Sequence, residues 1–144
     1  MKGIDIVDVA IGTYHAAAVS KEGELFTWGY GGNLLHQGAL GHGDTTDQPR
    51  PALVESLDTQ GSKVHAVSCG GAHTMALGTD GVLWAAGEGE SGRLGTGVSS
   101  LATFTPVDFP SDTTRCVQVS CGSDFTVAVD EFGGMWGWGK SGVG

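Results

Sequence analysis

The sequence is poor in charged residues, above all in basic ones. Only 16% of the 144 residues are charged, with 7 Lys or Arg against 16 Asp or Glu, so the net charge at pH 7 is −9. The basic residues are scattered along the chain, whereas a protein that binds a phosphate backbone needs a basic face. We therefore expect no direct nucleic-acid partner.

Long apolar runs are also absent. No run approaches the roughly 20 residues that span a bilayer, and the opening segment MKGIDIVDVAIG places acids inside what would be the apolar stretch of a secretory signal. The three cysteines lack zinc-ligand spacing, and their odd number favours reduced thiols. These features predict a cytoplasmic or nuclear protein without a membrane partner.

Proline is scarce and glycine is abundant. The 4 prolines and the lack of a triplet period exclude collagen. The 26 glycines disfavour helices, because each interior glycine costs about 1 kcal/mol relative to alanine. The composition predicts an all-β chain with many tight turns.

Three segments, starting at Val7, His65 and Gln118, align with one another without gaps. We predict repeat 1 at about 7–58, repeat 2 at about 64–110 and a partial repeat 3 at about 116–144. Each repeat contains short apolar or alternating runs separated by glycine turns, which are typical of strands. Four antiparallel strands in about fifty residues are typical of a propeller blade. The positions that we interpret as structural repeat positions are Gly12, Gly70, Gly122, Gly23, Gly81, Gly133, His15, His73, Trp28, Trp84 and Trp136.

The segment SCGGAHTMALGTDGVLWAAGEGESGRLGTG, residues 68–97, resembles the repeat of the regulator of chromosome condensation (RCC) family. The resemblance runs from Val7 to Gly144 and implies a β-propeller that normally has seven blades. Ala16 replaces the threonine of the signature in repeat 1, and Phe125 replaces its histidine in repeat 3. Seven blades need roughly 350 residues. We therefore expect the remainder of the propeller in the same chain, or alternatively in another chain.

Several side chains invite a chemical interpretation. We interpret His15 and His73 as structural histidines that hydrogen-bond to neighbouring backbone, and Cys69 and Cys121 as inert buried thiols. The tryptophans indicate core packing between blades. We predict no catalytic residue, no metal ligand and no cofactor.

Two phosphate-loop patterns occur, GMWGWGKS at 134–141 and GEGESG at 87–92. Neither has the strand-then-helix context that a phosphate site needs, so nucleotide binding is not expected.

The loop that follows repeat 1's third strand is longer than its counterpart in repeat 2. Tyr30, Leu34, Leu35 and His36 in this loop would form a protein-docking surface, unless the leucines fold under the loop. The leading hypothesis is a non-catalytic scaffold for protein–protein interaction. The resemblance also implies two alternatives: a guanine-nucleotide exchange factor for a Ran-like small GTPase, or the substrate-binding module of a ubiquitin ligase or kinase.

Overall fold

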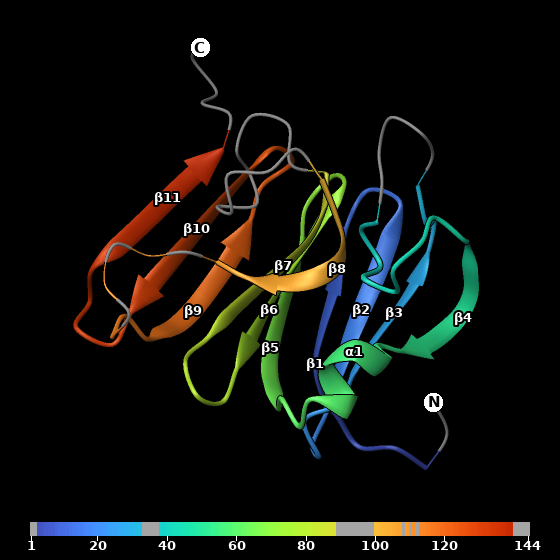
Figure 1. Cartoon of the computed structure of the whole chain (residues 1–144), viewed down its shortest axis with the longest axis horizontal. Helices are drawn as coiled ribbons and strands as arrows, with labels where there is room; N and C mark the ends of the chain where they lie inside the picture. Colours follow the sequence, from blue (N-terminus) through green and yellow to red (C-terminus); the bar gives the residue numbers. More distant parts are fainter. Residues whose placement is uncertain are drawn as a thin grey trace.

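The computed structural model describes residues 3–32, 38–88, 100–107, 109, 111 and 113–139. Three antiparallel sheets stand side by side like sectors of a fan (Figure 1). We call them blade 1, blade 2 and blade 3. Blade 1 contains β1 Ile6–Ile11, β2 His15–Ser20, β3 Leu25–Gly29 and β4 Gln48–Leu53. Blade 2 contains β5 Val64–Cys69, β6 His73–Gly78, β7 Leu83–Glu88 and β8 Ser100–Pro106, and blade 3 contains β9 Cys116–Cys121, β10 Phe125–Asp130 and β11 Met135–Gly139.

The described residues form an all-β partial propeller, as predicted. Consecutive strands pair in order within each sheet. The single described helix, α1 Glu55–Thr59, is little more than one turn and joins blade 1 to blade 2. The sequence also offers Pro106-Val107 as the start of a fourth strand in repeat 2, but in the structure that strand, β8, begins at Ser100 and ends at Pro106.

The turns between the second and third strands explain one set of repeated glycines. Gly23, Gly81 and Gly133 all have φ between 83° and 89°, a conformation that glycine adopts without steric cost. In blade 2, the Asp80 carboxylate accepts the Val82 N–H at 3.0 Å and closes the turn.

The hydrophobic core lies between the blades, in two clusters. The first, between blades 1 and 2, includes Val19 and Leu25, with Trp84 packed against it. The second, between blades 2 and 3, includes Met75 and has Trp138 packed against it. Two tryptophans therefore pack between blades as expected.

The other two tryptophans are placed differently. Trp136 contacts Phe109 edge-to-face, with ring centroids 5.3 Å apart, and its indole N–H donates to the Asp130 carboxylate at 2.9 Å. Trp28 is half-buried at the end of β3, where it pairs across the sheet with Ala16. Trp136 therefore combines a hydrogen bond within blade 3 with a contact at the junction between blades 2 and 3, whereas Trp28 pairs within blade 1.

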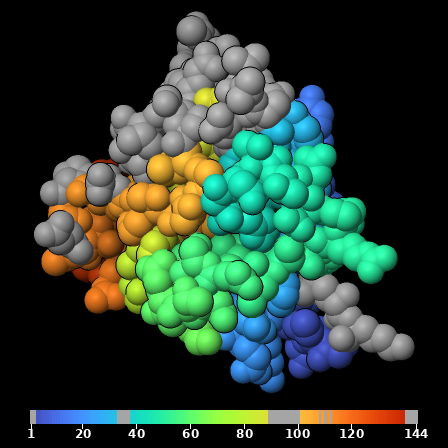
Figure 2. Space-filling model, turned by 45° about the vertical axis from the view of Figure 1, so that its right-hand side comes forward, coloured from blue at the N-terminus to red at the C-terminus, as the bar shows by residue number. Residues whose placement is uncertain are grey.

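A segment that follows β3 extends from blade 1 and forms backbone contacts with blade 2. Gly43 N–H donates to the Ala102 carbonyl at 2.8 Å, and His42 forms an isolated bridge with Thr103. Figure 2 shows this teal segment lying against the orange surface of β8. We call residues 38–43 the clasp. His42, for which a loop position in the sequence suggests solvent exposure, is half-buried and bonds the Thr27 hydroxyl at 2.9 Å.

Candidate functional site

A chain of hydrogen bonds crosses the junction between blades 1 and 2. The Thr74 hydroxyl donates to the carbonyl of Ala39 in the clasp at 2.6 Å. Since a hydroxyl has one proton, Thr74 must accept from His15 Nε2, which lies 2.8 Å away. We call this arrangement the His–Thr relay.

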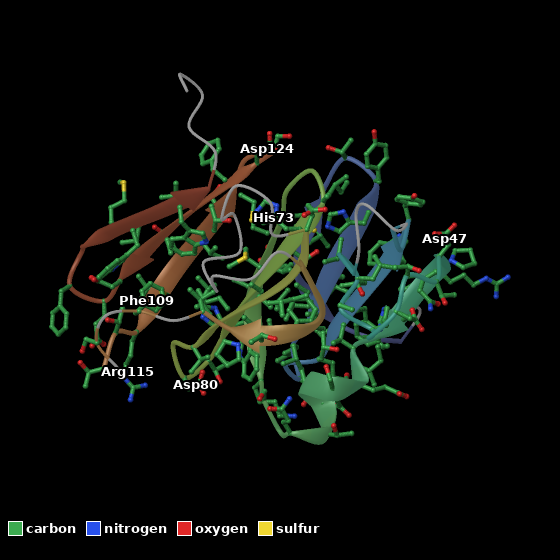
Figure 3. All side chains as sticks on the ribbon, turned by 45° about the horizontal axis from the view of Figure 1, so that its top comes forward. Asp47, His73, Asp80, Phe109, Arg115 and Asp124 are labelled. Carbon is green, nitrogen blue, oxygen red and sulfur yellow. The ribbon has the colours of Figure 1, made fainter. Side chains whose placement is uncertain are left out.

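The relay recurs at the next junction, where His73 Nε2 lies 3.0 Å from the Thr126 hydroxyl. Figure 3 shows His73 among the strands of the sheets. The expectation that these histidines bond neighbouring backbone holds for His15, which hydrogen-bonds the His73 backbone, but it did not include the threonine side chain of the following blade.

The repeated turn glycines make room for these rings. A methyl group on Gly12 would meet the His15 ring and the Gly70 carbonyl of blade 2. A methyl group on Gly70 would likewise meet the His73 ring, with the Gly122 carbonyl 2.7 Å away. Glycine is required here for close approach.

The surroundings of the His15 imidazole favour a structural role over proton transfer. Burial lowers the pKa of its imidazole, and a hydrogen bond with the His73 backbone only partly opposes this effect. An imidazole that is hydrogen-bonded to both the Thr74 hydroxyl and the His73 backbone of the next blade is suited to holding two blades in register.

The thiols are equally unreactive. Cys69, Cys116 and Cys121 are all free. Burial raises the pKa of Cys69 to about 12, helped by the neighbouring Cys121, and raises those of Cys116 and Cys121 to about 11. Nucleophilic catalysis needs a thiolate, and these groups are protonated at neutral pH.

A hollow of about 280 Å³ opens at the edge where the first turns of all three blades lie side by side, the top of Figure 1. The turns contribute equivalent residue pairs, and the chain after β3 completes the wall. The lining residues are Thr13, Tyr14, His15, Gly71, Ala72, Ser123, Asp124, Tyr30, Gly32 and Ala39. Asp124 lies at the edge of the sheets in Figure 3.

Two tyrosines dominate the hollow. Tyr14 and Tyr30 meet edge-to-face, with ring centroids 6.0 Å apart, and remain 66% and 39% exposed. Tyr30 N–H donates to the Tyr14 carbonyl at 2.9 Å, which fixes the two backbones together. The hollow is therefore an open site with an aromatic wall whose two tyrosines are joined by a backbone hydrogen bond.

The sequence analysis named Tyr30 as a candidate docking residue and did not name Tyr14, and both line the hollow. A usable signal was present, because the residue before each ring position changes from Tyr14 to Ala72 to Asp124 inside an otherwise repeated frame. Variation within a fixed frame marks a surface that can specialise. Leu34, Leu35 and His36 lie outside the described residues, so their predicted docking role stays a prediction.

The described parts of the two phosphate-loop patterns lie in strands. Residues 135–139 form strand β11, and residues 87 and 88 end strand β7. Within the described ranges, no three His, Cys, Asp or Glu side chains gather as a metal site requires. The same residues include no helix that is long and apolar enough to cross a membrane.

The sequence profile of the regulator of chromosome condensation (RCC1) repeat matches residues 22–77 and 80–129. A second profile of the same repeat matches residues 6–33, 64–93 and 116–144. The chain belongs to the RCC1 repeat family. The resemblance inferred from residues 68–97 is thereby confirmed.

RCC1-repeat relatives are much longer than this chain. Human E3 ubiquitin-protein ligase HERC2 is 42% identical over 97% of the chain, which spans 3% of that protein. The ultraviolet-B receptor UVR8 of Arabidopsis thaliana is 40% identical over 92% of the chain and 29% of its own length.

Solved structures show the same fold. Human WBSCR16 superposes with a TM-score of 0.82 at 26% identity, over 96% of this chain and 34% of that one. Prp20p of Saccharomyces cerevisiae, described with its binding to Gsp1p and histones, gives a TM-score of 0.72 at 27% identity, over 94% and 32%.

Proposed function

We propose that this chain is a non-catalytic docking module that binds a segment of another protein in the Tyr14–Tyr30 hollow. The observation that supports this proposal most strongly is that two exposed aromatic rings in edge-to-face contact line an open hollow formed by the turns of three blades. Exposed tyrosines supply large contact area with little loss of conformational freedom, which is why they are enriched at protein interfaces.

The charge of the chain bears on the partner. With a net charge of −9, long-range electrostatics favours approach of a basic protein surface and opposes a phosphate backbone. The partner segment we expect is basic around an aliphatic or aromatic residue that enters the hollow. Leu34, Leu35 and His36 come after Tyr30 in the sequence and would extend the same docking surface.

Two other roles are suggested by the relatives. Similarity to HERC2 supports substrate recruitment for a ubiquitin ligase, in which case the hollow would hold the substrate. The family resemblance implies nucleotide exchange on a Ran-like small GTPase as a second role, and the similar protein Prp20p is described with its binding to Gsp1p and histones. Both roles are compatible with docking, and they differ in the fate of the bound partner.

The test compares partners captured by the wild-type chain with those captured by Tyr14→Ser and Tyr30→Ser variants, using cross-linking and mass spectrometry. Phe132→Ser is the matched control, because Phe132 is an exposed aromatic residue that does not line the hollow. We expect the same partner to be lost from both tyrosine variants and retained by the control. Equal capture by all variants would exclude the hollow, and accelerated release of labelled GDP from a small GTPase would favour exchange.

A further inference from the structure

A second hollow, of about 360 Å³, opens where the clasp, β4, α1 and β8 meet. We call it the outer hollow. Its walls come from blade 1, from blade 2 and from the two segments that join them, so it belongs to the junction between these blades. Figure 2 shows the teal clasp, the green segment of α1 and orange β8 on one face of the molecule. The outer hollow shares no lining residue with the Tyr14–Tyr30 hollow.

The His42 ring has one nitrogen bonded within blade 1 and the other unpaired. The Thr27 hydroxyl donates its one proton to the Leu40 carbonyl at 2.6 Å. It must therefore accept from His42 Nε2, which lies 2.9 Å away, so the neutral ring carries its proton on Nε2. Among the described residues, Nδ1 has no hydrogen-bond partner, and this atom is not buried. Since His42 lines the outer hollow, the ring brings a hydrogen-bond acceptor to it.

Four other residues that line the outer hollow carry unpaired polar side chains. In the described part of the chain, no hydrogen bond is made by the side chains of Gln48, Glu55, Ser56 and Thr103. The Ser56 hydroxyl is buried without a partner, which is costly. Buried polar groups in proteins are normally paired, and a hollow with several convergent polar groups is typical of a binding site. The arrangement therefore indicates a polar ligand.

The hydrogen-bonding roles of these groups select the kind of ligand. His42 Nδ1 and the Glu55 carboxylate can only accept, whereas the two hydroxyls and the Gln48 amide can donate or accept. No Lys or Arg is among the described residues that line the outer hollow. The ligand must therefore supply donors, and Glu55 together with the net charge of −9 favours a cation. We propose that the outer hollow binds a primary ammonium group, the group that ends a lysine side chain or a free alkyl amine.

The positions of the acceptors favour an ammonium over a guanidinium. His42 belongs to the clasp and Glu55 to α1, so the two acceptors belong to different walls. A guanidinium is a planar fork that matches the two oxygens of one carboxylate, whereas an ammonium is compact and its three donors point in different directions. The Thr103 hydroxyl can accept the third N–H. The alkyl chain of the ligand would lie against Ala52 and Leu53 of β4, which line the same hollow.

The test is an NMR titration of the isotope-labelled chain, up to about 20 mM ligand, that follows the amide signals of Gly41 and Thr103. Nα-acetyl-lysine amide presents a lysine as a protein does, and Nα-acetyl-norleucine amide is the matched control without the ammonium group. We expect a saturable shift with the lysine compound and none with the norleucine compound. n-Pentylamine distinguishes the sources of the group, because weaker binding than the lysine compound assigns a protein lysine and tighter binding assigns a free amine.

Two variants test the acceptors. Glu55→Gln should weaken binding of the lysine compound about tenfold, because it removes the charge and leaves the side-chain length unchanged. Asp58→Asn is the matched control, since Asp58 is an exposed acid on the same helix that does not line the outer hollow. His42→Gln should weaken binding about fivefold, because its amide can still donate to Thr27 but lacks the ring acceptor.

Two results would overturn the proposal. One is a chain whose signals do not shift saturably with either amine, or shift equally with the norleucine compound. The other is a Glu55→Gln variant that binds the lysine compound as tightly as Asp58→Asn does. Glu55 is exposed and unpaired within the described residues, so this variant tests binding without disturbing the fold. Tyr14→Ser should bind like the wild type, which separates this site from the docking function.

Discussion

The two junctions between blades share a recurring frame of contacts and differ in the side chains that fill the space around it. Both place a ring nitrogen of one blade against a threonine hydroxyl of the next. Junction 1/2 adds the Asp8 carboxylate, which accepts the Val67 N–H at 3.0 Å, and the clasp. Junction 2/3 instead uses the Ser68 hydroxyl and the contacts of Phe109 with Trp136 and Trp138.

This difference distinguishes the contacts that align neighbouring blades from the side chains that fill the space between them. The relay and the turn glycines recur because they fix how close two blades lie and how they are aligned. The remaining space is filled by whichever side chains fit, a hydroxyl and aromatic rings in one place and a carboxylate in the other. Residues such as Tyr14 and Asp124 can therefore vary on the frame without disturbing it.

The largest expected effect comes from filling the space where blades meet. Gly12→Ala places a methyl group against the Gly70 carbonyl and should cost about 3 kcal/mol of unfolding free energy. Gly122→Ala is the matched control, because the nearest atoms to its methyl belong to the exposed Phe125 ring, which can move aside, and not to backbone. Urea denaturation of both variants measures the difference. Similar losses would show that close approach is not why this glycine recurs.

The relay itself should contribute less. Thr74→Val removes the acceptor of the His15 N–H and the donor to the Ala39 carbonyl, at a cost of about 1–3 kcal/mol. Adding His15→Phe should recover part of that loss, because it removes the unpaired N–H and copies the ring of blade 3. Chemical denaturation of the two single variants and the double variant forms a closed cycle. Strictly additive losses would contradict coupling between the two side chains.

The sequence predicted the strands and the turn glycines because these are local or recur within the chain. It also identified His15 and His73 as equivalent positions. Their threonine partners were not identified, because aligning repeats shows which positions are equivalent and not which equivalent positions touch. The contact joins His15 to Thr74, which are 59 residues apart. The roles of the clasp and of Tyr14 were not identified from the sequence for a related reason, since they depend on a neighbouring blade.

The smallest effect is a pH dependence that belongs to the junction between blades 1 and 2. Burial lowers the pKa of His15 from its ordinary value of 6.5 in the folded chain. Below that value the unfolded chain binds a proton that the folded chain does not, so stability falls as the pH falls. The limit for one such group is about 1.4 kcal/mol per pH unit.

A His15→Phe/Thr74→Ala variant isolates this contribution, since it removes the titrating group together with its hydroxyl partner. Denaturation at about pH 7.5, 6.5 and 5.5 should show the wild type losing stability faster than the variant. Carboxylates titrate in both proteins and cancel in the comparison. Parallel curves would mean that His15 takes up its proton in the folded chain as readily as in the unfolded one. The relay would then tolerate a charged imidazole, because Thr74 can accept a hydrogen bond from either form of the ring.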